Sequence, residues 1–254
     1  MSIPCSVYIV SLNCGQWLRR TLDSVKDFAE IIILDSGSTD DTYAIAQSYP
    51  QVKIRHQDWL GYSGQKALAL QECSQEWALN LDGDEELSPE LKAEIERTIA
   101  ECRLAGLVVP IRDAFMGKLS STGVRMHAKV RFFRRALGHY EAGIEVHEAV
   151  LVDGPVVRAS GAIYHYGEQS IAIKVDKNNS YSSLKAQEKS GKGKRANPLK
   201  LVLVMPLTFL KCYLLRRDFL NGWHGFIGSM INAFYAFLKE AKLYELNRSQ
   251  DKHD

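Results

Sequence analysis

The sequence predicts an α/β protein in which a mixed sheet carries helices on both faces and a helical extension follows. Over the first hundred residues, short β-branched runs alternate with helical patterns, which is typical of βαβ units on a parallel sheet. After residue 104, strand-like runs follow one another across glycine-bearing turns without helices between them, so the sheet becomes mixed. From Ile171 onward the pattern is helical.

The first half is expected to contain four strand and helix pairs, and its helix starts are chemically marked. Ser88 precedes Pro89, and the segment 38–40 offers capping side chains to the second helix. Parallel strands end at one edge of the sheet, where open α/β sheets bind ligands. The predicted pairs are Val7–Leu12 with Trp17–Val25, Ile31–Leu34 with Asp41–Ser48, Val52–His56 with Ser63–Cys73, and Trp77–Leu81 with Pro89–Cys102.

The second half is expected to complete the sheet before the helices begin. We therefore divide the chain into a catalytic domain, residues 1–170, and a helical C-terminal extension, residues 171–254. The segment Lys189–Arg195 is rich in glycine and lysine and is expected to be a mobile loop. The predicted strands are Leu104–Ile111, Lys129–Arg134, Glu145–Val152 and Val156–Tyr164.

Composition excludes several classes of protein. The 254 residues are 46% hydrophobic, enough for a sizeable core, and the net charge of +2 argues against a nucleic-acid partner. Five scattered cysteines without paired spacing argue against both a disulfide framework and a zinc site. The segment Met1–Val10 lacks a basic start and is expected to be a strand rather than a signal peptide, which predicts a cytoplasmic protein.

The near-neutral total hides a basic segment near the C-terminus. Residues 185–217 contain nine Lys and Arg but only one acid, Glu188. The apolar stretches Leu201–Leu210 and Phe226–Leu238 are shorter than the roughly 20 residues of a membrane-spanning helix. We expect them to lie on an anionic membrane surface, with ordinary core-packing helices as the alternative.

The most informative segment is Trp77–Leu87, where a strand of buried character ends in four carboxylates. Crowded carboxylates repel each other, and a divalent cation relieves the repulsion. Mg²⁺ and similar cations prefer oxygen ligands and bind through one or two carboxylates together with substrate phosphates. Asp82 and Asp84 are therefore candidate ligands of a metal that also holds a diphosphate. The alternative is a solvated acidic turn before a helix.

A second acidic turn, residues 34–40, ends the second strand. Parallel topology would bring Asp35 to the same edge as Asp82, and Asn13 follows the first strand there. A carboxylate at this edge can accept a hydrogen bond from a base imide or a ribose hydroxyl. Asp40 is expected to act as a capping residue.

Three of these segments in order, Ser11–Asn13, Leu34–Asp40 and Leu81–Glu85, resemble the N-terminal half of family 2 glycosyltransferases of the GT-A (Rossmann-like) fold. The general resemblance covers about residues 5–170. Further segments and the basic, apolar tail resemble bacterial lipopolysaccharide-core β-1,4-glucosyltransferases. These further segments are Gly61–Lys66, Arg131–Arg135 and Val146–Glu148.

The resemblance implies roles for individual residues. Asp35 would bind the nucleotide base, Asp82 would lie near ribose and metal, and Asp84 would bind the metal that bridges the diphosphate. His165 resembles a late histidine near that metal, with a half-exposed strand histidine as the alternative. Asn13, Lys66, Arg131 and Arg134 are expected to help bind the donor, because guanidinium and ammonium groups suit phosphates. A solvated basic strand face is the alternative for the two arginines.

By position Glu148 resembles the catalytic base of such enzymes. The family's usual Glu-Asp pair is here His147-Glu148, however, and Asp113, Glu141 and Glu145 remain competitors. The resemblance implies inverting transfer of a hexose from UDP-glucose, with Mg²⁺ or Mn²⁺, to a lipopolysaccharide-core heptose or a similar glycolipid. The enzyme would work on the inner face of the cytoplasmic membrane.

Two other functions compete with this hypothesis. A nucleotidyltransferase acting on sugar phosphates would also use paired acids and a metal, but it normally has a glycine-rich basic loop after the first strand, which the segment 13–18 lacks. A non-catalytic basic membrane-binding module would account for the tail. It would leave two acidic turns at one sheet edge unexplained.

Overall fold

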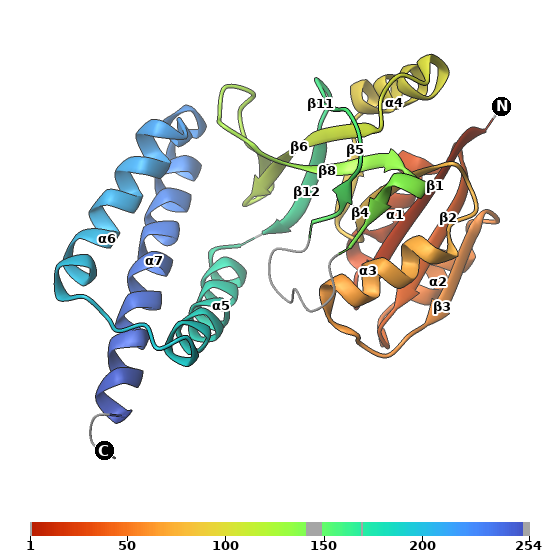
Figure 1. Ribbon diagram of the computed structural model, residues 1–254. Coiled ribbons are helices and arrows are strands. Elements are labelled where there is room, and N and C mark those ends of the chain that lie inside the picture. The colour runs from red at the N-terminus through yellow and green to blue at the C-terminus, as the bar shows by residue number, and fades with distance from the viewer. Residues whose placement is uncertain (1, 141–148, 169, 251–254) are drawn as a thin grey trace. The chain divides into compact units, whose positions relative to one another are not determined.

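The computed structural model of the protein describes residues 2–140, 149–168 and 170–250 (Figure 1). The chain forms two compact units. The sheet unit comprises residues 1–112 and 127–166, and the helical unit comprises residues 113–126 and 167–254. The segment 113–126, which precedes the domain boundary expected at residue 170, is part of the helical unit by its contacts.

The sheet combines a parallel half with an antiparallel half, in the order β3-β2-β1-β4-β8-β6-β12-β5. The pairs β3–β2, β2–β1 and β1–β4 are parallel, whereas β8 runs antiparallel to both β4 and β6. The mixed sheet predicted from the sequence is confirmed. Its strands are β1 (Ile3–Ser11), β2 (Phe28–Asp35), β3 (Val52–His56), β4 (Trp77–Asp82), β5 (Glu85–Leu87), β6 (Gly106–Phe115), β8 (His127–Arg134), β11 (Val156–Arg158) and β12 (Ile163–Glu168).

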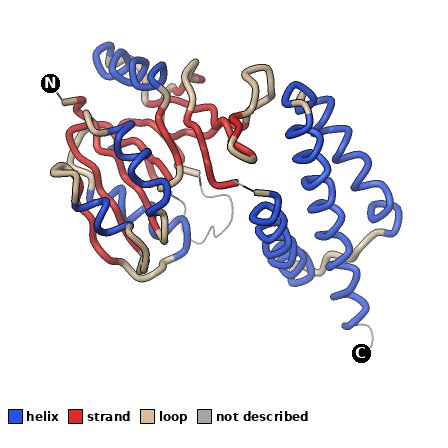
Figure 2. The backbone as a smooth tube through the Cα atoms, turned by 180° about the vertical axis from the view of Figure 1, so that it is seen from behind, coloured by secondary structure: helices blue, strands red, loops and turns tan. Residues whose placement is uncertain are grey.

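Alternating side chains give the sheet two apolar faces, and helices cover both (Figure 2). In β1, Val7 and Ile9 join one core, while Tyr8 joins the other. The first core also contains residues of α1 (Gly15–Val25), α2 (Thr42–Gln47) and α4 (Pro89–Glu101), and the second contains residues of α3 (Gly61–Glu72).

The predicted helix starts are partly correct. The Ser88 hydroxyl accepts a hydrogen bond from the Leu91 amide at 3.2 Å and caps α4, as predicted. At α2, by contrast, the N-cap residue is Asp41, whose side chain makes no capping bond. Asp40 instead accepts from the amides of Thr42 at 3.1 Å and Gly15 at 2.9 Å, so it joins the starts of two helices.

Two predicted strands differ from the structure. The run Val156–Tyr164 is broken after residue 158, because the Glu94 carboxylate accepts the amides of Ser160 and Gly161 at 3.0 and 3.1 Å. These amides are therefore not available to a strand ladder. Of Glu145–Val152, residues 145–148 lie outside the described part. The end of that run forms β10 (Leu151–Val152), which pairs with β9 (Gly138–His139).

The helical unit is built from α5 (Ile171–Gly191), α6 (Pro198–Leu210) and α7 (Trp223–Gln250), together with β7 (Lys118–Leu119), which pairs with the end of β6. A π-helical segment, Lys211–Leu215, prolongs α6. The segment Lys189–Arg195 was expected to be a mobile loop, but its first three residues form the end of α5, and only residues 192–195 lie in the loop that follows. In the structure the Asn247 side chain ties it to α7, accepting the Ala196 amide at 2.9 Å and donating to the Lys194 carbonyl at 3.4 Å.

Gly161 allows the chain to pass closely over α4, and its replacement tests this packing. A Cβ atom there would lie 2.3 Å from the Leu91 backbone nitrogen, a contact that no side-chain rotation relieves. We expect Gly161→Ala to lower the free energy of unfolding by about 2–3 kcal/mol, as overpacking typically does. Gly64→Ala, inside α3 of the same unit, meets only the Leu60 Cβ at 3.1 Å and should cost less. Urea denaturation of both variants measures the difference, and equal stabilities would contradict the account.

Candidate active site

The carboxyl ends of β1 and β2 are joined by reciprocal hydrogen bonds around Asn13. This residue has a left-handed backbone, with φ 51°. Its amide donates to the Ser38 hydroxyl at 2.7 Å, and its side-chain oxygen accepts the Thr39 amide at 2.9 Å. The structure therefore brings Asn13 and the acidic turn of residues 34–40 together at one edge, as the topology predicted.

Asp35 is fully buried and organises this turn. One carboxylate oxygen accepts the amides of Gly37 and Ser38 at 2.9 and 2.7 Å, and the other accepts the hydroxyls of Ser11 and Ser38. Gly37 has φ +101°, a conformation that glycine adopts without strain. Asp35 thus holds the backbone of the turn in place at the predicted nucleotide edge.

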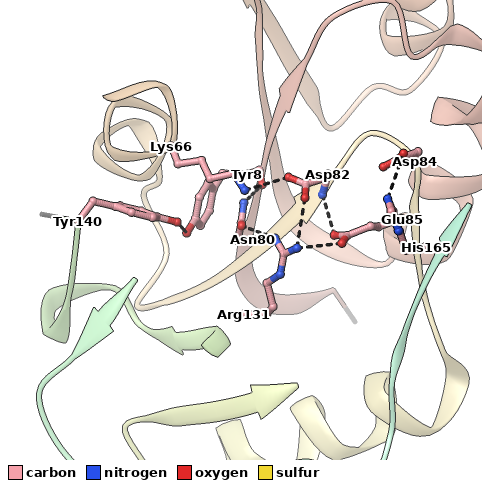
Figure 3. Close-up of polar contacts among 9 residues, drawn as sticks. All are labelled: Tyr8, Lys66, Asn80, Asp82, Asp84, Glu85, Arg131, Tyr140 and His165. Atoms are coloured by element: carbon pink, nitrogen blue, oxygen red, sulfur yellow. Dashed lines mark hydrogen bonds and ion pairs between the residues drawn. The ribbon is translucent and has the colours of Figure 1, made fainter. Parts of the chain in front are cut away.

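Asp82, at the end of β4, lies between two buried cations (Figure 3). Its carboxylate oxygens lie 3.0 Å from Lys66 Nζ and 3.2 Å from Arg131 Nη2. The two cationic side chains are only 5% and 6% exposed, whereas that of Asp82 is 32% exposed. Burial raises the pKa of Asp82, but Lys66 and Arg131 outweigh it and hold this pKa well below its usual range.

A second carboxylate, that of Glu85, is buried beneath the turn and holds its backbone. It accepts Arg131 Nη2 at 2.8 Å and the Asp82 amide at 2.9 Å, and its side chain is 2% exposed. Burial raises the pKa of Glu85, and Arg131 opposes this shift. Arg131 also donates to the Asn80 side chain. We call Lys66, Asn80, Asp82, Glu85 and Arg131 the buried ion cluster.

Asp84 points to the other side of this turn, toward His165 (Figure 3). The His165 Nε2 atom lies 3.4 Å from a carboxylate oxygen of Asp84, and both side chains are partly exposed. Strand β12 makes this contact possible, because His165 pairs with Glu85 and the Tyr166 amide donates to the Asp84 carbonyl at 3.0 Å. Of the three residues predicted to lie at the metal, Asp84 and His165 are neighbours, whereas Asp82 contacts Lys66 and Arg131.

The donor set around Asp84 suits a divalent cation that binds substrate as well as protein. Among the described residues, no group of three or more His, Cys, Asp or Glu side chains is arranged to hold a metal. Asp84 and His165 could supply two ligands to such a cation, with water and phosphate oxygens completing its coordination. Mg²⁺ is usually held in this way, through one or two protein side chains plus substrate phosphates.

An aromatic pair that no sequence pattern indicated borders the acidic turn. Trp17 and Tyr166 stack with ring centroids 5.5 Å apart, and the Arg20 guanidinium lies 4.5 Å from the Tyr166 centroid. Tyr166 also donates to Glu86 at 2.7 Å. These contacts link α1, the acidic turn and β12, so they fix the position of the His165 strand.

Some predicted site residues lie elsewhere. Arg134 is at the opposite end of β4, beside Trp77, where it pairs with Glu76 and donates to the carbonyls of Cys102 and Leu104. The structure does not bring it to the nucleotide edge. Glu148, proposed as the base, and its competitors Glu141 and Glu145 fall outside the described residues. Asp113 belongs to the helical unit.

A Rossmann-like mixed sheet with two acidic turns at the carboxyl ends of its parallel strands is the arrangement of the GT-A fold. The model of the family described as "Glycosyl transferase family 2" matches residues 6–153, and the chain belongs to this family. It is a glycosyltransferase. Over 250 residues it is 36% identical to the "Lipopolysaccharide core biosynthesis glycosyltransferase LpsC" of Rhizobium meliloti, covering 96% of this chain and 93% of that protein.

Other relatives and solved structures agree with this assignment. An uncharacterized glycosyltransferase of Rickettsia typhi is 35% identical over 95% of the chain and 87% of its own length. The structure of S. aureus TarS 1–349 in complex with UDP-GlcNAc superposes with a TM-score of 0.53, 14% identity, and coverage of 98% of this chain and 92% of that one. GalNAc-T7 with UDP, GalNAc and Mn²⁺ gives 0.50, 15% identity, and 66% and 44% coverage. These structures share the fold.

The buried ion cluster should dominate the stability of the site. Arg131→Met leaves Asp82 and Glu85 without their shared cation, and we expect a loss of about 3–5 kcal/mol in the free energy of unfolding. Arg55→Met is the matched control, because it breaks an ion pair near the surface: the Arg55 side chain is 46% exposed and that of Glu72 is 29% exposed. Its loss should not exceed about 1 kcal/mol. If chemical denaturation gives similar losses in the free energy of unfolding for both variants, the buried ion cluster does not dominate the stability of the site.

Proposed function

We propose that the protein transfers a hexose, glucose from UDP-glucose, to a lipopolysaccharide-core or similar glycolipid acceptor with inversion at the anomeric carbon. The observation that carries the proposal is the divided acidic turn, in which Asp82 is held between Lys66 and Arg131 while Asp84 faces His165. The name of the Rhizobium relative supports the acceptor class, and the UDP-GlcNAc complex of TarS supports a nucleotide-sugar donor.

In this proposal different residues bind different parts of the nucleotide-sugar donor. Asp84 and His165 would hold Mg²⁺ or Mn²⁺, which supplies charge stabilisation to the departing diphosphate. Asp82, kept ionised by its two cations, is directed toward the ribose and the metal. Asp35 holds the turn that receives the nucleotide base, and Asn13 fixes its neighbouring loop.

The acceptor hydroxyl needs a base, because it is too weak an acid to attack unaided at neutral pH. We assign this role to Glu148. The nearest described residues, Ala149 and Val150, border a small polar cavity that Lys66, Asn80 and Arg131 also line. Residues 149 and 150 therefore lie beside the buried ion cluster, and this proximity supports the proposed role of Glu148.

Removal of the metal ligand tests the proposed chemistry. Asp84→Ala should abolish Mn²⁺-dependent turnover of UDP-glucose, by at least about 10²-fold, while the melting temperature stays the same or rises, because one repelling carboxylate is lost. Asp153→Ala removes an exposed carboxylate of the same unit and serves as the control. Near-normal turnover by Asp84→Ala would exclude the proposed metal site.

The identity of the base is tested by isosteric variants. Glu148→Gln should lower kcat by about 10²–10⁴-fold with donor KM nearly unchanged, since the proton transfer matters in the transition state. The variants Glu141→Gln, Glu145→Gln and Asp113→Asn are measured in parallel. If one of them loses kcat while Glu148→Gln remains active, the role passes to that residue.

We further propose that the helical unit attaches the enzyme to the inner face of the cytoplasmic membrane. The continuous helix Pro198–Leu215 has a mean hydropathy of 1.6 and only 6% of it is buried, and by length and composition it could cross a membrane. Its exposed leucines form a stripe at helical spacing. The stripe consists of Leu199, Leu203, Leu207, Leu210 and Leu214, which are 41–67% exposed.

The turn after this helix favours a helix lying on the surface. Residues 216–222, which include the charged Arg216, Arg217 and Asp218, separate the helix from α7, and α7 packs back along α6. Insertion of the hairpin tip first would carry three charges into hydrocarbon, at about 2.5–3.5 kcal/mol for each. A helix in the plane of the interface buries its leucine stripe and keeps these charges in water.

A charge in the leucine stripe should weaken attachment. Leu207 and Leu184 are 59% and 58% exposed, on α6 and α5 respectively. Leu207→Glu replaces an exposed leucine of the proposed lipid contact with a charge and should lower partitioning onto vesicles about 10-fold or more. Leu184→Glu should have little effect. Sedimentation with lipid vesicles measures both, and equal binding by the two variants would rule out the α6 stripe as the contact.

A further inference from the structure

Five lysines, on or directly after the helices α5, α6 and α7, lie near two glutamates in the helical unit. Lys189 of α5 and Lys200 of α6 both pair with the Glu240 carboxylate of α7, the latter at 3.1 Å. Glu240 is only 3% exposed, so it serves as the internal counter-ion of the group. We call this group the lysine cluster; it consists of Lys185, Lys189, Lys192, Lys200, Lys239, Glu188 and Glu240.

The lysine cluster carries more positive than negative charge. Lys185 and Lys192 share the exposed Glu188, at 2.8 and 2.7 Å. With Glu188 and Glu240 as the acids of the group, five ammonium groups face two carboxylates, a surplus of three positive charges. Such crowding costs stability unless an anion relieves it.

Lys239 shows the imbalance most clearly. It is half-buried, with its Nζ 5.4 Å from the Tyr235 ring centroid, and in the described part of the chain it forms no ion pair within 4.0 Å. Burial lowers the pKa of Lys239, and the nearby Lys189, Lys200 and Lys185 lower it further, against the opposing effect of Glu240. An anion bound beside it would remove this penalty.

The position of the cluster indicates what kind of anion it binds. Lys200 lies in the first turn of α6, next to Leu199, where the exposed leucine stripe begins at 67% exposure. The lysine cluster thus adjoins the leucine stripe, whose 16 residues at 1.5 Å each extend over about 24 Å. A soluble anion would use only the charge, whereas a lipid with a phosphate headgroup matches both surfaces.

We propose that the lysine cluster binds the phosphate headgroup of an anionic lipid whose acyl region contacts the leucine stripe. This inference rests on the proposed membrane attachment and extends it, since the stripe supplies affinity for any bilayer and the cluster selects anionic lipid. Each lysine near an anionic surface contributes about 1 kcal/mol, or about fivefold in binding.

The test compares vesicles of phosphatidylcholine alone with vesicles that also contain phosphatidylglycerol. The triple variant Lys189→Gln, Lys200→Gln, Lys239→Gln should lose about 100-fold in binding to the anionic vesicles and little to the neutral ones. The control triple variant Lys26→Gln, Lys118→Gln, Lys177→Gln removes the same charge from exposed positions elsewhere. It should lose less than about fivefold. Equal losses by the two triple variants would overturn the proposal.

Two single variants guard against a folding defect in the triple variant. Lys239→Gln leaves both partners of Glu240 in place and should still lose about fivefold on anionic vesicles. Glu240→Gln should have the opposite effect and strengthen binding to anionic vesicles, because it removes the carboxylate that pairs with Lys189 and Lys200. Weaker binding by a folded Glu240→Gln variant, judged by its melting temperature, would contradict a phosphate site.

Two measurements without lipid distinguish a lipid site from a site for a soluble anion, and the lipid proposal from the catalytic proposal. Inorganic phosphate at millimolar concentration should raise the melting temperature little and displace vesicles poorly. If phosphate stabilises the protein strongly while vesicles do not bind, the site serves a soluble anion and the lipid assignment is wrong. Mn²⁺-dependent UDP binding should be the same in all lysine variants, so failure of the lipid site leaves the transferase proposal intact, and the reverse also holds.

Discussion

The contact of Arg131 with Asp82 and Glu85 is the constraint on which the rest of the site depends. Removing an ion from water costs several kcal/mol, and the cost is repaid only when partners and hydrogen bonds are well placed. Here Arg131 reaches Asp82, Glu85 and Asn80, Lys66 adds a second cation, and Glu85 also holds the Asp82 amide. The cluster therefore fixes the backbone of the turn as well as the charge of Asp82.

This arrangement separates two carboxylates that differ by only two positions. Asp82 is occupied by protein cations, whereas Asp84 projects toward His165 and solvent. A strand end that simply exposed both groups would leave them equivalent. Arg131 and Glu85 hold Asp82 in place. The Asp84 carboxylate, which no buried lysine or arginine contacts among the described residues, is therefore available to a positively charged ligand.

The sequence predicted the parallel half of the fold well, because short-range periodicity and helix caps determine it. It also placed Asn13, Asp35, Asp82, Asp84 and His165 at one edge. The role of Glu85 was missed, since its direction depends on β8, a strand more than forty residues later. An asparagine inside an otherwise apolar strand, Asn80, was the available signal of a buried polar partner.

Long-range contacts also account for the wrong expectations. Arg131 and Arg134 look alike in sequence, yet β8 runs antiparallel to β4, so Arg131 approaches the carboxyl end of β4 and Arg134 its beginning. The predicted strand Val156–Tyr164 was interrupted by the distant Glu94 carboxylate. Neither effect leaves a local pattern. Likewise, charge counting found the basic tail, but only the packing of α5, α6 and α7 gathered its lysines with Lys239 around one buried glutamate.

The most direct test of the account is a crystal structure of the protein with UDP and Mn²⁺, with the metal located by its anomalous scattering. We expect one peak beside the Asp84 carboxylate and His165, with the diphosphate on the same metal and the uracil at the turn of Asp35. Asp82 should keep its contacts with Lys66 and Arg131. A metal bound elsewhere, or UDP at another edge of the sheet, would contradict the central claim.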